Sequence, residues 1–199
     1  MSKKAEIKNF VGRKIKFLQS QAETGEGKGM LANLRRGVGC ELGEVPQLFG
    51  LVLLDMPETF LSRDGKATKE EWACYTALTL YALHQQGFDI KEKSMHIDEN
   101  VSIGRSLLFL SERQEDSNRE KRAMQKLQTL ITSQDRKEIS YHLKGLVQML
   151  SREGIPLNYT ILAADLFEIQ NLEGKKRVSM RWGQDFYTKR NQEGRLSNE

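Results

Sequence analysis

The last third of the chain carries apolar residues at the spacing of an α-helix. A first set falls at i, i+4, i+7, i+8 and i+11 and consists of Ile139, Leu143, Leu146, Val147 and Leu150. A second set falls four residues apart and consists of Val178, Trp182 and Phe186. Such faces need other helices to cover them, and no segment alternates apolar and polar residues over a useful strand length. The pattern therefore predicts an all-α fold.

Helix start and stop signals predict further helices along the rest of the chain. The predicted helices cover residues 5–22, 30–36, 46–54, 69–86 and 103–112, stretches that start near Ser117 and Asp135, and residues 159–170 and 176–189. Thr68-x-x-Glu71 is a capping box for the helix 69–86, which is apolar nearly all round and is expected to be buried. The glycines of Gly25–Gly29 predict a loop, and Glu173–Gly174 predicts a turn before the last helix.

Residues 89–100 are polar and irregular and are expected to separate two domains. At 199 residues the chain can bury the core of one domain or of two small ones. The predicted architecture is two helical bundles joined by a short linker. The N-terminal helical bundle covers residues 1–95 and the C-terminal helical bundle covers residues 96–199.

Residues that carry enzyme or metal chemistry are few and scattered. Cys40 and Cys74 form no Cys-x-x-Cys motif. The three histidines lack the spacing of metal ligands; they are His84, His96 and His142. The segment Gly25–Gly29 lacks the P-loop pattern, and the Glu-x-Lys pairs at 26–28 and 173–175 lack the companion acids of a metal-dependent nuclease. We therefore predict no catalytic residue, no metal site, no cofactor and no enzymatic activity.

The chain shows no targeting or membrane-spanning signal. No N-terminal segment joins a charged region to a continuous apolar run, and the longest uncharged stretch, Trp72–Phe88, is too short to cross about 30 Å of hydrocarbon. The protein is expected to be cytoplasmic and soluble. The helix 5–22 leaves one alternative open, because Phe10 and Phe17 fit a helix lying on an anionic membrane as well as they fit packing on the N-terminal bundle.

Charge is distributed unevenly, although the net charge is only +4. Residues 1–36 carry nine basic and three acidic groups, whereas residues 37–100 carry five and eleven. Residues 101–153 carry ten basic and seven acidic groups. The segregation permits a basic face even though the overall charge is modest.

Basic residues gather on successive predicted helices and on the sides away from the apolar faces. They are Arg35, Arg36, Arg105, Arg119, Arg122, Lys126 and Lys144. Two interpretations stay open on this pattern: solvated surface charges, or one face that binds the backbone of a polyanion.

The last helix carries residues that invite a binding site. Trp182 fits stacking on a base, but its shared face with other apolar residues favours the core. Arg181, Asp185 and Lys189 stand four residues apart and predict an ion-pair ladder within the helix.

Six short segments follow one another between about Phe10 and Tyr187. They are Leu34–Gly37 (LRRG), Ala77–Gln85 (ALTLYALHQ), Ser102–Arg105 (SIGR), His142–Lys144 (HLK), Ile155–Tyr159 (IPLNY) and Trp182–Tyr187 (WGQDFY). No single segment is diagnostic, but their order and spacing resemble the CasB small subunit of the type I-E CRISPR surveillance complex, Cascade. The resemblance spans nearly the whole chain.

The resemblance implies an all-helical, non-catalytic protein with two bundles. Two copies would lie head to tail along Cascade and contact its backbone subunits and its large subunit. Their basic surface would hold the displaced non-target DNA strand and stabilise the R-loop. The implied partners are single-stranded DNA, the backbone of the guide RNA–DNA heteroduplex, a second copy and other Cascade subunits, with no membrane.

The resemblance also assigns nucleic-acid binding to six basic residues: Arg35, Arg36, Arg105, Lys121, Arg122 and Lys144. Lys144 stands where an arginine is common, which keeps the charge but loses the bidentate fork. Apolar residues follow Arg105 where further basic residues are expected. The alternative is a helical module that contacts only protein subunits or RNA, with no strand-holding role.

Overall fold

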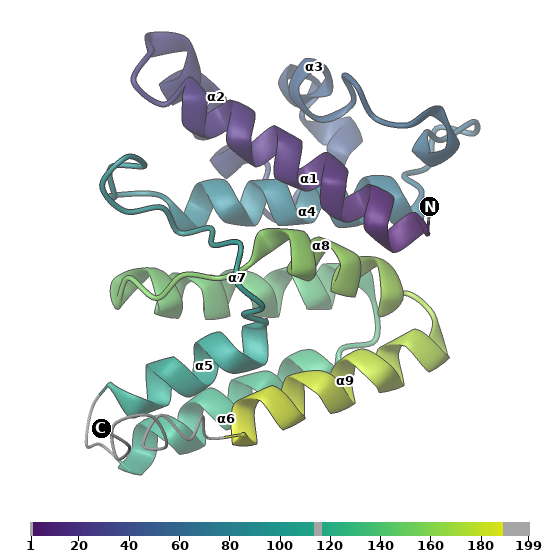
Figure 1. The fold of residues 1–199 in the computed structure, drawn as a ribbon. Helices are drawn as coiled ribbons and strands as arrows, with labels where there is room; N and C mark the ends of the chain where they lie inside the picture. Colours follow the sequence, from purple (N-terminus) through teal and green to yellow (C-terminus); the bar gives the residue numbers. More distant parts are fainter. Residues whose placement is uncertain (1, 114–116, 189–199) are drawn as a thin grey trace, which may run out of the picture.

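The computed structural model describes residues 2–113 and 117–188, except for the side chains of Ser117 and Arg119. Over these residues it is built from helices, and its only β-type contact is an isolated bridge between His96 and Leu157 (Figure 1). The predicted all-α fold is confirmed. The α-helices are α1 (Lys3–Ser20), α2 (Gly25–Arg36), α3 (Phe49–Val52), α4 (Lys69–His84), α5 (Ile103–Glu112), α6 (Ser117–Thr132), α7 (Arg136–Arg152), α8 (Tyr159–Glu168) and α9 (Leu172–Tyr187). Three 3-10 turns are η1 (Leu42–Glu44), η2 (Pro46–Leu48) and η3 (Glu58–Phe60).

The central helix of the molecule is α4, as its sequence predicts. Its capping box is complete: the Glu71 amide donates to Thr68 Oγ1 over 3.0 Å, and the Thr68 amide donates to Glu71 Oε2 over 2.7 Å. Helices α1, α2, α7 and α8 pack around it and bury nearly every side. Beyond its end, Gly87 has a φ of +87°, a conformation that favours glycine.

The apolar face of α1 is covered by α4 and α8. Its buried side chains include Ile7, Phe10, Val11, Ile15 and Leu18. Phe10 therefore packs in the core, as the packing alternative predicts, whereas Phe17 is 43% exposed and is not part of the buried cluster. Within the described ranges, no helix combines the length and apolarity needed to cross a membrane.

Helices α5, α6 and α9 form the layer farthest from α1 and α2 (Figure 1). A β-carbon added to Gly104 of α5 would lie 2.0 Å from the carbonyl oxygen of Trp182, so the backbones of α5 and α9 touch. Ser102, the N-cap of α5, donates from its hydroxyl to Asp185 Oδ2 over 2.5 Å. The segments SIGR and WGQDFY thus meet at one helix crossing.

Trp182 is buried at 2% exposure, and its indole N–H donates to Asp165 Oδ2 over 2.7 Å. Its predicted place in the core is confirmed. The predicted ladder within α9 is wrong for its two described members. Arg181 pairs with Asp165 of α8 and Asp185 accepts from Ser102, because both face neighbouring helices rather than solvent. Lys189 lies outside the described residues.

Two helices begin earlier than predicted, so that their first turns contain glycines that were expected to form a loop or turn. In α2 the amide of Gly27 donates to the N-cap Thr24 Oγ1, and in α9 the amide of Gly174 donates to the N-cap Asn171 Oδ1. A β-carbon at Gly27 would lie 1.9 Å from the Gln21 carbonyl oxygen. These glycines therefore allow the new helix to start against the end of the preceding segment.

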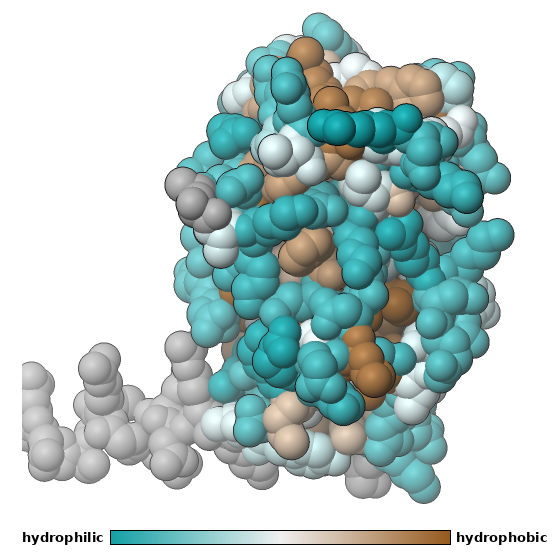
Figure 2. Space-filling model, turned by 90° about the vertical axis from the view of Figure 1, so that its right-hand side faces the viewer, coloured by the Kyte–Doolittle hydropathy of each residue, from teal (hydrophilic) through white to brown (hydrophobic). Residues whose placement is uncertain are grey.

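The segment predicted as the helix 46–54 contains the 3-10 turn η2 and only a single turn of α-helix, α3. Phe49 and Leu54 are 40% and 63% exposed there. Figure 2 shows one face of the molecule, which is largely hydrophilic, with apolar side chains gathered near its upper end and smaller apolar spots lower down. The capping box predicted at Ser117 falls on a side chain outside the described part of the chain.

The segment between α4 and α5 is irregular, as predicted, and it is tied into the molecule. The Met95 amide donates to Gln85 Oε1 over 2.8 Å, and the Met95 carbonyl accepts from the Leu157 amide over 3.1 Å. Met95 and His96 are both buried. One continuous cluster of buried apolar residues extends across both halves of the chain. The boundary at residues 95 and 96 stays a prediction.

Candidate nucleic-acid interface

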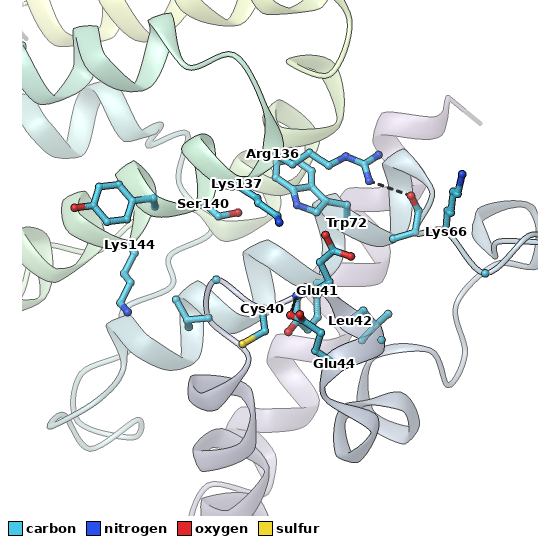
Figure 3. Close-up of a pocket in the computed structure, with 17 residues that line it drawn as sticks. Cys40, Glu41, Leu42, Glu44, Lys66, Trp72, Arg136, Lys137, Ser140 and Lys144 are labelled. Atoms are coloured by element: carbon cyan, nitrogen blue, oxygen red, sulfur yellow. Dashed lines mark hydrogen bonds between the residues drawn. The ribbon is translucent and has the colours of Figure 1, made fainter.

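Two adjoining hollows run along the exposed side of α7. The first lies between α7 and the loops Val38–Glu44 and Gly65–Ala67, and Figure 3 shows Lys137 and Lys144 extending into it from α7. The second lies between α7 and α6. Tyr141 and Lys144 line both hollows, so the two form one groove. We call the α7 groove the surface formed by Lys126, Thr129, Lys137, Ser140, Tyr141, Lys144, Gly145 and Gln148.

Helical periodicity places the groove residues of α7 on one side of that helix. Lys137, Tyr141, Lys144 and Gln148 fall at i, i+4, i+7 and i+11, whereas the buried apolar stripe that starts at Ile139 occupies the opposite side. The N-cap of α7 is the predicted one, because the Glu138 amide donates to Asp135 Oδ1 over 2.8 Å. The cap and the buried stripe together hold α7 in place and leave its polar side in the groove.

Within the described part of the chain, the lysines of the α7 groove lack acidic partners. Lys126, Lys137 and Lys144 are exposed, and no carboxylate of the described residues lies within ion-pairing distance of them. Some lysines elsewhere in the described ranges are paired; Lys4 Nζ, for example, lies 3.1 Å from Glu168 Oε2. Unpaired cations on two neighbouring helices create a positive potential that favours a polyanion such as a phosphate backbone.

Among the described residues that line the two hollows, the acidic side chains stand on the far wall of the first. Glu41 and Glu44 line that wall, and Glu44 Oε2 accepts from the Glu41 amide over 2.7 Å (Figure 3). These carboxylates repel phosphate, so an anionic strand is favoured along α6 and α7 rather than along the loop Val38–Glu44.

Arg136 also lines the first hollow, but its guanidinium is used inside the fold. It donates to the carbonyl oxygens of Ala67 and Thr68 over 3.0 and 3.3 Å and to Gln170 Oε1 over 2.9 Å. Its central carbon lies 5.4 Å from the centre of the Trp72 ring. Partial burial lowers the pKa of Arg136. This residue joins the start of α7 to α4 and α8, and it has few donors left for a ligand.

Three of the six predicted binding residues lie along α6 and α7. Lys144 is in the α7 groove. Arg122 is exposed on α6, one helical turn before Lys126, which places both on the same side of that helix. Lys121 is an exposed neighbour of Arg122. The structure thus brings Lys144 together with the basic side of α6, through Lys126.

The other three predicted residues lie at different places. Arg35 lines a separate hollow that it shares with Lys28 and the segment Gln85–Ile90. Arg36 is exposed, and its guanidinium donates to Asn33 Oδ1 over 3.3 Å. The half-buried Arg105 donates to the carbonyl oxygen of Thr188 over 2.5 Å and so satisfies the end of α9.

Sequence reasoning missed Lys137 and Tyr141 and left Lys126 out of the final set of binding residues. The periodicity of α7 carried a usable signal, because the side opposite the apolar stripe reads lysine, tyrosine, lysine and glutamine. The sequence contained no such signal for the far wall of the first hollow, because the loop Val38–Glu44 is distant from α7 along the chain.

The groove offers cations and hydroxyl or amide groups but no cluster suited to a metal. Across residues 2–113 and 117–188, no three His, Cys, Asp or Glu side chains gather in a way that would hold an ion. The buried Cys74 thiol has its pKa raised by burial, so it stays protonated and unreactive. The arrangement is suited to holding an anionic chain by charge.

Comparison with known proteins agrees with the family that the sequence segments suggest. The family model of the CRISPR-associated protein Cse2 matches residues 30–187, which include the whole α7 groove. The crystal structure of CasB from Thermobifida fusca has a TM-score of 0.74 and 26% sequence identity to the chain, and the match covers 92% of this chain and 98% of that one. No curated protein matches the chain. The chain belongs to the CRISPR-associated Cse2 family, the CasB small subunits of the type I-E Cascade complex.

Proposed function

We propose that this Cse2 protein binds the displaced non-target strand in the α7 groove and thereby stabilises the R-loop. The observation that carries the proposal is a set of exposed lysines on adjoining helices that have no acidic partner among residues 2–113 and 117–188: Lys126, Lys137 and Lys144. Such a surface binds phosphates without reading sequence and carries out no catalysis of its own.

The energetic argument requires only modest binding. Guide RNA pairing replaces a DNA duplex by a heteroduplex of similar stability, so the exchange is nearly balanced. Any subunit that binds the expelled strand shifts this balance toward the open state. Each phosphate neutralised on a single strand adds about −0.7 to the slope of log affinity against log salt. A few contacts give weak binding to the isolated protein.

Assembly would make this weak contact effective. Within Cascade the displaced strand is already close to the groove, so its effective concentration is high. We propose that the other Cascade subunits and a second copy of the chain provide this placement. Residues outside the groove, namely Arg35, Arg36, Arg105, Lys121 and Arg122, stay predicted contacts to the displaced strand or to the backbone of the guide RNA–DNA heteroduplex.

The test replaces Lys126, Lys137 and Lys144 together by glutamine, which keeps most of each side chain and removes its charge. Reconstituted Cascade with this variant is expected to form R-loops that dissociate faster. For single-stranded DNA binding to the isolated variant, the salt slope should fall in magnitude by about 2, the loss of three phosphate contacts. The measurements are R-loop lifetime and single-strand affinity at a series of salt concentrations.

The matched control replaces Lys8, Arg13 and Lys16, three exposed cations of α1, by glutamine. The charge change is the same, but the groove stays intact, so R-loop lifetime and salt slope should remain close to those of the natural protein. If the groove variant behaves like this control, the groove is not the strand-binding surface. Absence of single-strand binding even at low salt would instead support a scaffold that contacts only protein subunits or RNA.

A further inference from the structure

An exposed aromatic ring stands in the middle of the α7 groove. Tyr141 is 73% exposed and lies where the two hollows meet. Its ring contacts His142 edge to face, with centroids 5.2 Å apart and planes at 77°. Its hydroxyl has no hydrogen-bond partner in the part of the chain that the structure covers. Apart from this contact with His142, the fold leaves most of the ring exposed to the groove.

Cations flank the ring along the helix and across the groove. Lys137 and Lys144 stand seven residues apart on α7, which separates them by about 10 Å along the axis, and Tyr141 lies about one turn from each. Lys126 lines the second hollow from α6. A β-carbon added to Gly145, one turn after Tyr141, would meet nothing within 4 Å, so space is open beside the ring.

This combination suits a single strand better than a duplex. Single-strand grooves combine cations that hold the backbone with aromatic side chains on which unpaired bases stack. In a duplex the bases are stacked on one another and their faces are closed to a side chain. We infer that Tyr141 is a base-stacking platform that gives the α7 groove a preference for unpaired over paired nucleic acid. The inference rests on the proposed function and deepens it.

The charges around the ring favour a nucleic acid over a docked protein. An apolar protein surface placed on Tyr141 would desolvate Lys137, Lys144 and Lys126 without supplying partners for them, at a free-energy cost. A strand pairs these cations with its phosphates while a base covers the ring. Glu41 and Glu44 on the far wall keep the phosphates on the lysine side.

The test separates the base from the backbone. The full-length chain and its Tyr141→Ala variant are titrated at low salt with fluorescent oligothymidine and with an abasic strand that has the same number of phosphates. We expect the variant to bind oligothymidine about tenfold or more weakly, the effect of losing one stacked base. Its affinity for the abasic strand and its salt slope should stay unchanged, because the lysines remain.

The conservative variant Tyr141→Phe keeps the ring and should keep the affinity for oligothymidine, whereas Tyr141→Leu should bind as weakly as Tyr141→Ala. Equal binding of both strands by the natural protein, with a loss only in the lysine-to-glutamine variant, would overturn the stacking role and leave the proposed function standing. No binding of either strand would overturn both. Loss of assembly into Cascade without any change in strand affinity would assign Tyr141 to a protein contact and overturn the inference.

Discussion

Two basic residues of α7 show how surroundings decide the role of a residue. Arg136 gives its guanidinium N–H groups to backbone carbonyls and to Gln170, and it covers the Trp72 ring. Lys144 extends into the groove with no acidic partner among the described residues. From the sequence alone, both residues would be interpreted as surface cations. Only the neighbours show that Arg136 stabilises the fold and that Lys144 is left for a ligand.

His84 gives a prediction about pH at the same scale. It is fully buried in α4, and its Nδ1 lies 2.9 Å from the Tyr159 hydroxyl. Burial lowers the pKa of His84 to about 4. In the folded chain the His84 ring therefore stays neutral, whereas in the unfolded chain it takes up a proton as the pH falls through the ordinary histidine pKa. This difference in protonation lowers the free energy of unfolding by about 2 kcal/mol when the pH falls from about 7 to about 5.

Urea unfolding of the natural protein and of His84→Gln at both pH values checks this. The amide of glutamine retains a polar group beside Tyr159 but does not titrate, so the variant should lose less stability on acidification. Asp165 acts in the opposite direction, because burial raises its pKa to about 6 and the folded state then gains from taking up a proton. Since Asp165 is present in both proteins, the difference between them isolates His84. Equal losses would show that His84 is not responsible.

At the scale of elements, some glycines near the starts of helices are required by contacts with another segment, and helix propensity alone does not predict this. A β-carbon at Gly27 would approach the Gln21 carbonyl oxygen to 1.9 Å, and the contact is with backbone, which cannot move aside cheaply. Gly27→Ala is expected to destabilise the protein by about 1–3 kcal/mol, although alanine is the better helix former. Thermal or urea unfolding measures the change.

Gly29→Ala is the matched control in the same helix. Nothing lies within 4 Å of its added β-carbon, so the substitution should stabilise by up to about 1 kcal/mol through helix propensity. Opposite signs for the two variants would confirm that contact, and not conformational freedom, requires glycine at position 27. Stabilisation by both would show that the start of α2 has room for a side chain.

The same glycines mark the limit of prediction from the sequence. Apolar spacing and caps placed α4 and α7 correctly and gave α5 its observed bounds, because those signals act within one helix. The predicted starts of α2 and α9 were wrong because glycine was interpreted as a helix breaker. In the structure, glycine is needed there because the preceding segment lies too close for a side chain. The groove was harder still: Lys144 was predicted, but the wall at Glu41 and Glu44 joins it only through the fold.

For the whole molecule, the question is whether the two predicted bundles behave as separate units. Helix α8 follows the boundary at residue 95 in the sequence, yet it packs against α1 and α4 of the first half. Tyr159 of α8 reaches His84 and the carbonyl oxygen of Leu80, both in α4. With one continuous apolar cluster across the boundary, unfolding of either half would expose the buried face of the other.

We therefore expect a single cooperative unfolding transition, and the two tryptophans allow a test within one molecule. Trp72 lies on α4 and Trp182 on α9, so Trp182→Phe leaves a reporter only in the first half and Trp72→Phe leaves one only in the second. In each variant the fluorescence transition in urea should coincide with the far-ultraviolet circular dichroism transition, which follows all helices. The comparison is made within each variant, so a loss of stability from the substitution does not affect it. A fluorescence midpoint that departs from the dichroism midpoint in either variant would show that the bundles unfold separately and that residues 95 and 96 mark a true domain boundary.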